Sequence, residues 1–135
     1  MKNNYYLSGF MSKKNNYGSG VWVNFPLSPT DRVEAYTKIG LDYEWDWDDI
    51  VFTEWKQSDN ILDLGRCEDI DVLNDIVDDI NSLSSDDYRK LLAIIEVEGT
   101  INTFDAEMFG LNLDMYNLYN ADELHNTKYG VLQCL

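Results

Sequence analysis

The segment Ile70-Asp-Val-Leu-Asn-Asp-Ile-Val-Asp-Asp-Ile-Asn-Ser-Leu83 carries an apolar pattern with the period of an α-helix. The apolar members of this pattern are Ile70, Leu73, Ile76 or Val77, Ile80 and Leu83. The opposite side of the same helix carries Asp71, Asp75, Asp78 and Asp79. An amphipathic helix buries one face and exposes the other, so the segment predicts a helix that packs on a core and displays carboxylates.

The chain before residue 60 has a different pattern, which favours strands. Residues 5–11, 20–26 and 50–56 are rich in β-branched and aromatic side chains, and a polar, glycine-rich connection separates the first two. Ser28 or Thr30 can cap a short helix over residues 31–39, with Gly40 as its C-terminal breaker. The order strand, strand, helix, strand predicts a small three-stranded antiparallel sheet with one helix.

Further helices are predicted after residue 83. Ser84-Ser-Asp-Asp87 resembles a capping box and leads into a helix over residues 88–97, which Gly99 ends. The remaining predicted elements are a helix over 103–109, an extended segment over 111–119, a turn of helix over 120–125 and a strand over 129–135.

These elements together define an α+β protein. A chain of 135 residues can bury roughly 68% of its unfolded surface, which is enough for one core or two small packed units. The predicted units are an N-terminal sheet unit (1–60), an acidic helical unit (61–100) and a short mixed C-terminal segment (101–135).

Residues 42–49, Asp-Tyr-Glu-Trp-Asp-Trp-Asp-Asp, alternate carboxylates with aromatic rings. In an extended segment this alternation places the carboxylates on one face and the rings on the other. Like charges on one face repel each other, so the pattern favours a scaffold that displays carboxylates to a partner. The candidate partner-binding residues are Asp42, Glu44, Asp46, Asp48, Asp49, Asp71, Asp75, Asp78, Asp79, Asp86 and Asp87.

The net charge of the chain indicates what kind of partner this is. The formal charge is −15 and the pI about 4.1, yet 44% of the residues are hydrophobic, which excludes an acidic disordered chain. Residues 1–30 contain three lysines and no acid, whereas residues 31–135 hold all 25 acids against 7 basic residues, a balance of −18. Such a field repels nucleic acid and anionic membranes. The expected partner is therefore a basic protein surface.

No residue pattern indicates catalysis, a metal ion or a cofactor. Residues 42–48 imitate the start of a calcium loop, but Trp47 replaces its glycine and Thr53 its final glutamate. His125, the only histidine, has no nucleophile–base pattern around it, which favours a surface or capping role.

The cysteines and the hydropathy of the chain indicate its compartment. Cys67 and Cys134 make neither a disulfide framework nor a zinc site. No apolar run reaches the about 18 residues of a membrane helix, and the N-terminus lacks the apolar run of a signal peptide. A cytoplasmic protein with reduced thiols is expected.

Several segments carry the motifs of a known family. They are Gly20-Val-Trp-Val-Asn-Phe-Pro26, the helix ending at Ile39-Gly40, the aromatic-acidic third strand, the helix start Ile70-Asp-Val-Leu-Asn74 and the Leu91-Leu92 helix. In order and spacing the chain resembles the antirestriction protein ArdA family over roughly residues 5–100. Beyond residue 100 it is shorter and departs from the pattern of the family.

The resemblance implies an elongated acidic mimic of bent B-form DNA. Members of this family are carried by plasmids, transposons and phages, and they occupy the DNA site of type I restriction-modification enzymes. The resemblance thus implies an inhibitor without enzymatic activity or cofactor, acting in the cytoplasm of a bacterial host. The family dimerises through a C-terminal unit that is shortened here, so a monomer or a differently built dimer is expected.

Other functions remain open at this point. A DNA mimic could inhibit a different defence enzyme, such as a CRISPR effector. An acidic adaptor could bind proteins without any competition with DNA. An acidic helix face is also often no more than a solvated face.

Overall fold

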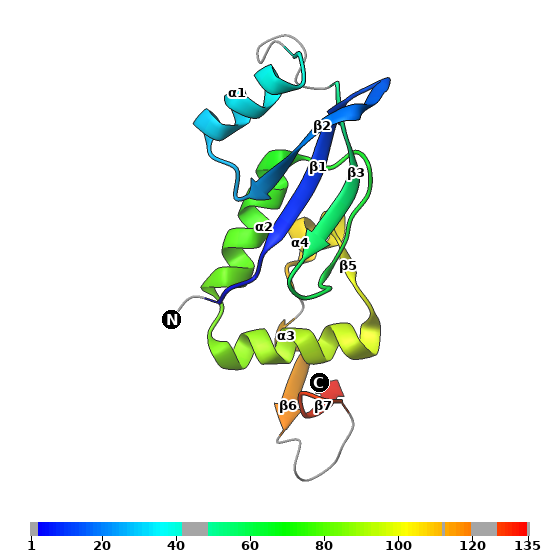
Figure 1. Cartoon of the computed structure of the whole chain (residues 1–135). Coiled ribbons are helices and arrows are strands. Elements are labelled where there is room, and N and C mark those ends of the chain that lie inside the picture. The colour runs from blue at the N-terminus through cyan, green and yellow to red at the C-terminus, as the bar shows by residue number, and fades with distance from the viewer. Residues whose placement is uncertain (1–2, 42–48, 112, 120–126, 135) are drawn as a thin grey trace.

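The computed structural model describes residues 3–41, 49–111, 113–119 and 127–134 (Figure 1). Its elements are β1 (Leu7–Lys13), β2 (Asn16–Phe25), α1 (Pro29–Lys38), β3 (Ile50–Gln57), β4 (Leu62–Asp63), α2 (Ile70–Ser82), α3 (Ser85–Glu98), β5 (Ile101–Asn102), α4 (Thr103–Phe109), the 3₁₀ turn η1 (Leu113–Met115), β6 (Tyr116–Tyr119) and β7 (Val131–Cys134). The predicted α+β class and the predicted sheet are confirmed.

The main sheet has the strand order β2-β1-β3, with both neighbours antiparallel to the central strand β1. Leu7 pairs with Phe25 on one side and with Gln57 on the other. Gly9 lies where β1 passes under an aromatic side chain of β3, and a Cβ atom there would stand 2.7 Å from the Trp55 ring. Any larger residue would therefore force the Trp55 and Phe52 rings to shift.

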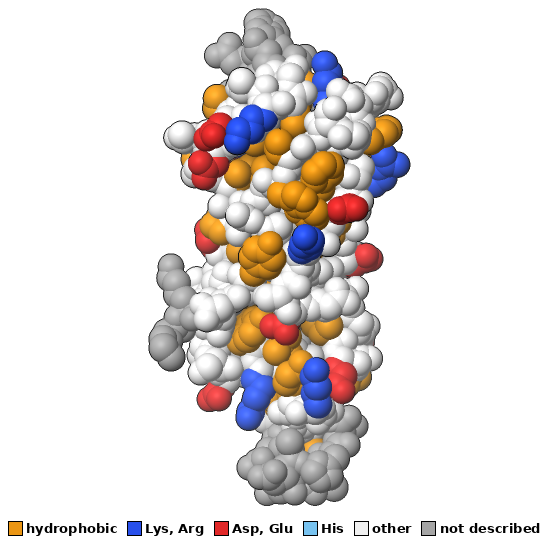
Figure 2. Space-filling view, in the orientation of Figure 1, with side chains coloured by type: hydrophobic (Ala, Val, Ile, Leu, Met, Phe, Trp, Pro, Cys, Tyr) orange, Lys and Arg blue, Asp and Glu red, His pale blue; other side chains and the backbone are white. Residues whose placement is uncertain are grey.

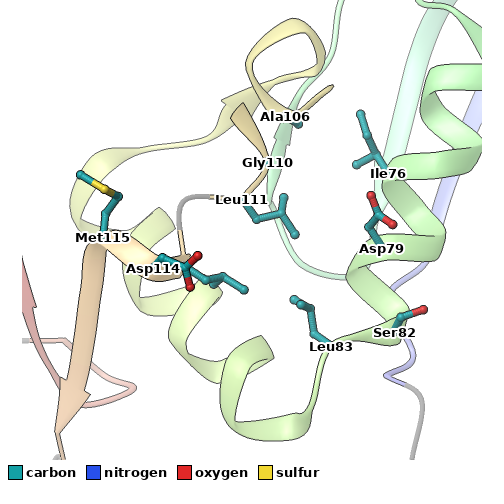
Figure 3. A pocket seen from close by; sticks show the side chains of 10 residues that line it. Ile76, Asp79, Ser82, Leu83, Ala106, Gly110, Leu111, Asp114 and Met115 are labelled. Atoms are coloured by element: carbon teal, nitrogen blue, oxygen red, sulfur yellow. The ribbon is translucent and has the colours of Figure 1, made fainter. Parts of the chain in front are cut away.

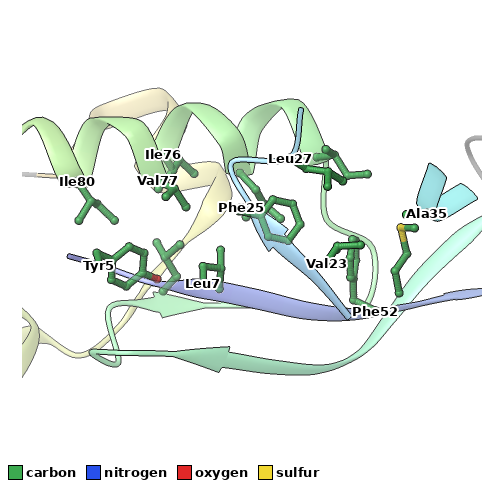
Figure 4. Packing of buried hydrophobic residues seen from close by; sticks show 14 of the residues in the cluster. Tyr5, Leu7, Val23, Phe25, Leu27, Ala35, Phe52, Ile76, Val77 and Ile80 are labelled. Carbon is green, nitrogen blue, oxygen red and sulfur yellow. The ribbon is translucent and has the colours of Figure 1, made fainter. Parts of the chain in front are cut away.

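One face of this sheet and the helix α2 form the core (Figure 4). Leu7, Phe25 and Phe52 of the sheet lie opposite Ile76 and Ile80 of α2, and all five side chains are buried. This hydrophobic cluster runs from residue 5 to residue 106, so the two sides of the predicted boundary at residue 60 share it. The division into units at residues 60 and 100 stays a prediction.

Two asparagines on one edge of α2 fasten the helix to the sheet unit. Asn74 donates to the carbonyl of Leu27 (3.0 Å) and accepts from its N–H (2.6 Å). Seven residues further on, Asn81 donates to the carbonyl of Tyr5 (3.0 Å) and accepts from its N–H (2.9 Å). Each amide thereby satisfies both hydrogen-bonding groups of one residue outside the sheet ladder.

The helix α3 is buried on two sides. Leu91 belongs to the main core, while Ala93 and Ile94 pack against Leu132 in a second cluster under the β6-β7 hairpin. Figure 1 accordingly shows α3 lying between the body of the molecule and this hairpin. The sequence predicts one apolar stripe on this helix, formed by Tyr88, Leu91, Leu92 and Ile95. It does not show the second buried side, because two apolar faces obscure the helical period.

Element boundaries differ from the predicted ones in small ways. The predicted helix over 88–97 begins already at Ser85, and the helix over 103–109 is found as expected. The parallel pair of β4 with β5 was missed, because two-residue strands are too short to show a period. The predicted turn over 120–125 lies outside the described residues.

Within the described ranges, no helix combines the length and the apolar character needed to cross a membrane.

We expect Asn74→Ala to lower the free energy of unfolding by about 1–3 kcal/mol, because the main-chain groups of Leu27 lose their partner. Urea denaturation measures the change. Asp75→Ala is the matched control on the exposed face of the same helix, and it should stay within about 0.5 kcal/mol of the wild type. Equal effects of the two variants would contradict a fastening role for Asn74.

Candidate functional site

The candidate site is the solvent face of α2. Asp71, Asp75, Asp78 and Asp79 are all exposed, on the side of the helix opposite its buried stripe. Asp71, Asp75 and Asp79 are successive i,i+4 neighbours, about 6 Å apart along the helix axis from a rise of about 1.5 Å per residue. The structure therefore brings these four predicted carboxylates together on one short helix.

This helix begins at a cap that the sequence analysis did not assign. The Asp69 carboxylate accepts from the N–H groups of Asp71 (2.8 Å) and Val72 (3.3 Å). A negative charge at this position also interacts favourably with the helix dipole. The sequence signal for this cap was an aspartate directly before the first apolar residue of the helical pattern. The capping hydrogen bonds explain Asp69 by helix stability rather than by display to a partner.

Asp71 differs from the other three aspartates because it already has a cationic partner. Its Oδ1 atom lies 3.0 Å from Nη1 of Arg32 on α1. The Arg32 side chain is 12% exposed and the Asp71 side chain 71% exposed. Much of the charge of Asp71 is thus offset within the chain, which leaves Asp75, Asp78 and Asp79 as the stronger anionic group of this face.

Asp86 and Asp87 lie in the first turn of α3, and both are exposed. The predicted cap is confirmed, since the Ser84 hydroxyl accepts from the N–H of Asp87 at 3.1 Å. Carboxylates in a first helical turn stabilise the helix through its dipole. These two candidates therefore have a structural reason to be acidic, whether or not they also meet a partner.

The remaining candidates belong to the acidic-aromatic stretch. Asp49 is exposed, and its carbonyl accepts from the N–H of Lys14 at 2.8 Å, which fixes the chain next to the β1-β2 turn. Asp42, Glu44, Asp46 and Asp48 lie outside the described residues. Their predicted display on one face stays a prediction.

The sheet presents a face of different character, seen in Figure 2 as apolar patches with blue and red side chains between them. Here Trp22 is 41% exposed and meets Phe10 edge-on at 5.4 Å between ring centroids. The Lys56 ammonium lies 4.5 Å from the Trp22 ring centroid, a cation–π contact across the central strand. In Figure 1 α2 lies behind this sheet, so the aromatic face and the aspartates of α2 are separated by the core.

Two tyrosines, the buried Tyr5 and the half-buried Tyr88, have pKa values above the usual range of a tyrosine. The Tyr5 hydroxyl donates to Oε1 of Gln57 and the Tyr88 hydroxyl to Oδ2 of Asp59, both at 2.5 Å. Burial raises the pKa of the Tyr5 hydroxyl above its usual range, and the nearby Tyr88 and Asp59 raise it further. Burial and the hydrogen bond to Asp59 likewise raise the pKa of Tyr88. Both groups hold the strand–helix junction together in their neutral form.

Among the described residues, no group of three or more histidine, cysteine, aspartate or glutamate side chains is placed to hold a metal ion. What the described carboxylates can do is accept hydrogen bonds and offset positive charge. Carboxylates accept bidentate hydrogen bonds from arginine, as phosphates do.

Comparison with protein-family models, with curated proteins and with solved structures finds no match to this chain. The resemblance to the ArdA family stays a prediction from the sequence motifs.

We expect the aspartates of α2 to differ in their effect on stability. Asp71→Asn should lower the free energy of unfolding by about 0.2–1 kcal/mol, because it removes an exposed ion pair with Arg32. The triple change Asp75→Asn, Asp78→Asn, Asp79→Asn should leave stability equal or slightly higher, because the repulsion between Asp75 and Asp79 disappears. Urea denaturation at low salt compares the two. A triple variant less stable than Asp71→Asn would refute this ranking.

We expect the protein to lose stability in alkaline solution. An unfolded tyrosine ionises near pH 10, whereas Tyr5 and Tyr88 keep their protons to higher pH in the folded state. Their stabilisation is complete below about pH 10 and is lost as the pH rises above it. Tyr5→Phe should therefore flatten the decline of the unfolding free energy above pH 10. Tyr6→Phe, at a residue that is 47% exposed, is the control, and an equal flattening in both variants would contradict a specific role of Tyr5.

Proposed function

We propose that this protein inhibits a DNA-binding enzyme of bacterial defence by occupying the enzyme's DNA site, with type I restriction-modification enzymes as the first target class. The observation that carries the proposal is the row of exposed carboxylates on α2, a helix held to the sheet by its core and its asparagines. The motifs shared with the ArdA family support the same function.

The spacing of charge is compatible with DNA mimicry. Duplex DNA carries about one charge per 1.7 Å of axis, or one per 3.4 Å along each strand. The α2 aspartates repeat at about 6 Å along the helix axis, which is sparser than one phosphate strand. Asp49, Asp86 and Asp87 lie on neighbouring elements and add to the negative field. A basic DNA channel would meet a folded surface whose carboxylates already have fixed positions.

The fold can support this concentration of charge. Like charges at i,i+4 positions cost only about 0.2–0.5 kcal/mol per pair. Typical domain stabilities of about 5–15 kcal/mol exceed that cost many times over. The buried stripe of α2 and its two asparagine contacts add stabilising contributions on the same helix.

The principal alternative is an acidic adaptor that binds a basic protein without displacing DNA. The ion pair of Asp71 and the first-turn positions of Asp86 and Asp87 favour it, since they give these three acidic residues a structural reason that does not depend on DNA mimicry. An inhibitor of a CRISPR effector could also act by DNA mimicry. It would differ from an inhibitor of restriction-modification enzymes only in its target.

Competition with DNA distinguishes the two classes. Purified type I restriction-modification enzyme is titrated with the protein in the presence of a fluorescent duplex that carries its recognition site. We expect DNA release that saturates near stoichiometric ratios and weakens with rising salt, because exposed charges are screened within about 8 Å at physiological ionic strength. Inhibition of cleavage with the duplex still fully bound would refute mimicry. The same DNA-release titration with a Cas effector and its own target duplex tests CRISPR effectors as the alternative target.

Two sets of substitutions test whether the carboxylates of α2 are responsible for the inhibition. The triple change Asp75→Asn, Asp78→Asn, Asp79→Asn should weaken inhibition roughly threefold to a hundredfold, from about 0.2–1 kcal/mol per exposed pair. A control with Glu54→Gln, Asp63→Asn and Glu107→Gln removes the same number of exposed charges from residues outside α2. Equal inhibition by both variants would mean that α2 has no special role.

A further inference from the structure

A hollow of about 590 Å³ opens beside the acidic face of α2 (Figure 3). It lies between α2, the start of the connection to α3, the end of α4 and η1. The residues that line it are Ile76, Asp79, Ser82, Leu83, Ala106, Gly110, Leu111, Leu113, Asp114 and Met115. We call this hollow the α2–α4 groove.

The most buried residues that line the α2–α4 groove are apolar. Ile76 and Ala106 are buried, and Leu83 and Leu111 are partly buried; in Figure 3 the two leucine side chains point into the space between them. Met115, at its edge, is 53% exposed. A methionine side chain adapts to irregular partners, so the edge can adjust to an inserted side chain.

Carboxylates stand on both sides of this apolar surface. Asp79 projects from α2 and Asp114 from η1, on opposite sides of the groove in Figure 3, and both are exposed. Of the described residues that line the groove, none is a lysine or an arginine. The groove thus combines an apolar floor with uncompensated negative charge at its rim.

We infer that the α2–α4 groove binds a basic amphipathic helix of the target protein. One apolar side chain of that helix enters between Leu83 and Leu111, while lysines or arginines beside it meet Asp79 and Asp114. Helix-in-groove recognition uses such an apolar anchor, and the acidic rim selects the basic flanks. A second copy of this chain fits poorly, because two copies of charge −15 repel each other.

This inference rests on the proposed function for the basic character of the partner, but it adds a different kind of contact. Carboxylate–cation pairs on the helix surface weaken in salt, whereas burial of an apolar anchor does not. The complex should therefore keep part of its affinity at ionic strengths that screen the pairs on the exposed face of α2.

The first test uses the isolated protein with methyl-¹³C-labelled methionine and a synthetic 18-residue peptide of leucine and lysine at helical spacing. We expect the Met115 methyl signal to shift on titration, while the signal of Met11, which is fully buried in the core, stays in place. A peptide of the same composition with scrambled order controls for charge. Equal shifts with both peptides, or no shift of Met115, would overturn the inference.

The second test uses substitutions at exposed positions, where folding should be unaffected. Met115→Lys places a cation at the rim and should weaken binding of the amphipathic peptide at least tenfold. Val33→Lys introduces the same charge at an exposed apolar position on α1 and should change binding less than twofold. Equal losses of peptide affinity in both variants would mean that only net charge determines binding, and would refute binding in the α2–α4 groove.

The outcome for the groove and the outcome for the proposed function are distinguishable. If the peptide leaves the Met115 signal unchanged while the protein still releases DNA from the enzyme, helix binding in the groove is refuted and DNA mimicry is retained. If the peptide binds in the groove but no DNA is released from the enzyme, DNA mimicry is refuted and helix binding in the groove is retained.

Discussion

Two side-chain amides, those of Asn74 and Asn81, determine how α2 sits on the sheet. Each binds both main-chain groups of one residue, Leu27 or Tyr5, so the helix is fixed in its position along the sheet and in its rotation about its own axis. Hydrophobic contacts alone are non-directional and would allow small shifts. The direction in which the aspartates point therefore follows from these four hydrogen bonds together with the buried stripe.

A fixed rotation has a functional consequence for a charged surface. A flexible acidic chain would have to order its side chains and backbone on binding, at a cost in conformational entropy. Asp75, Asp78 and Asp79 instead stand on a helix whose backbone is already ordered. Preorganisation of this kind increases affinity mainly by lowering the cost of binding.

The sequence could predict what depends on local periodicity. The helix over Ile70–Ser82, the cap at Ser84 and the three strands of the sheet follow from patterns within a few residues. It could not predict what depends on distant partners. Asn74 and Asn81 bind residues 47 and 76 positions away, and Asp71 pairs with Arg32, 39 positions away. A polar residue inside a helical pattern looks the same whether it meets solvent or a distant partner, so the pattern could not show that Asp71 pairs with Arg32.

In the proposed complex, the aspartates and the groove beside them would contribute two different kinds of force to recognition. Charge complementarity mainly accelerates encounter and orients the partner, and it declines with salt. Differences between related complexes arise mostly in the dissociation rate, which depends on desolvated contacts near the centre of an interface. Asp79 belongs to both regions, because it lies on the acidic face and on the rim of the groove. A partner steered by the field of α2 would thus arrive where one of its apolar side chains can be buried. In the proposed complex, the edge of this helix would therefore be the region that slows dissociation.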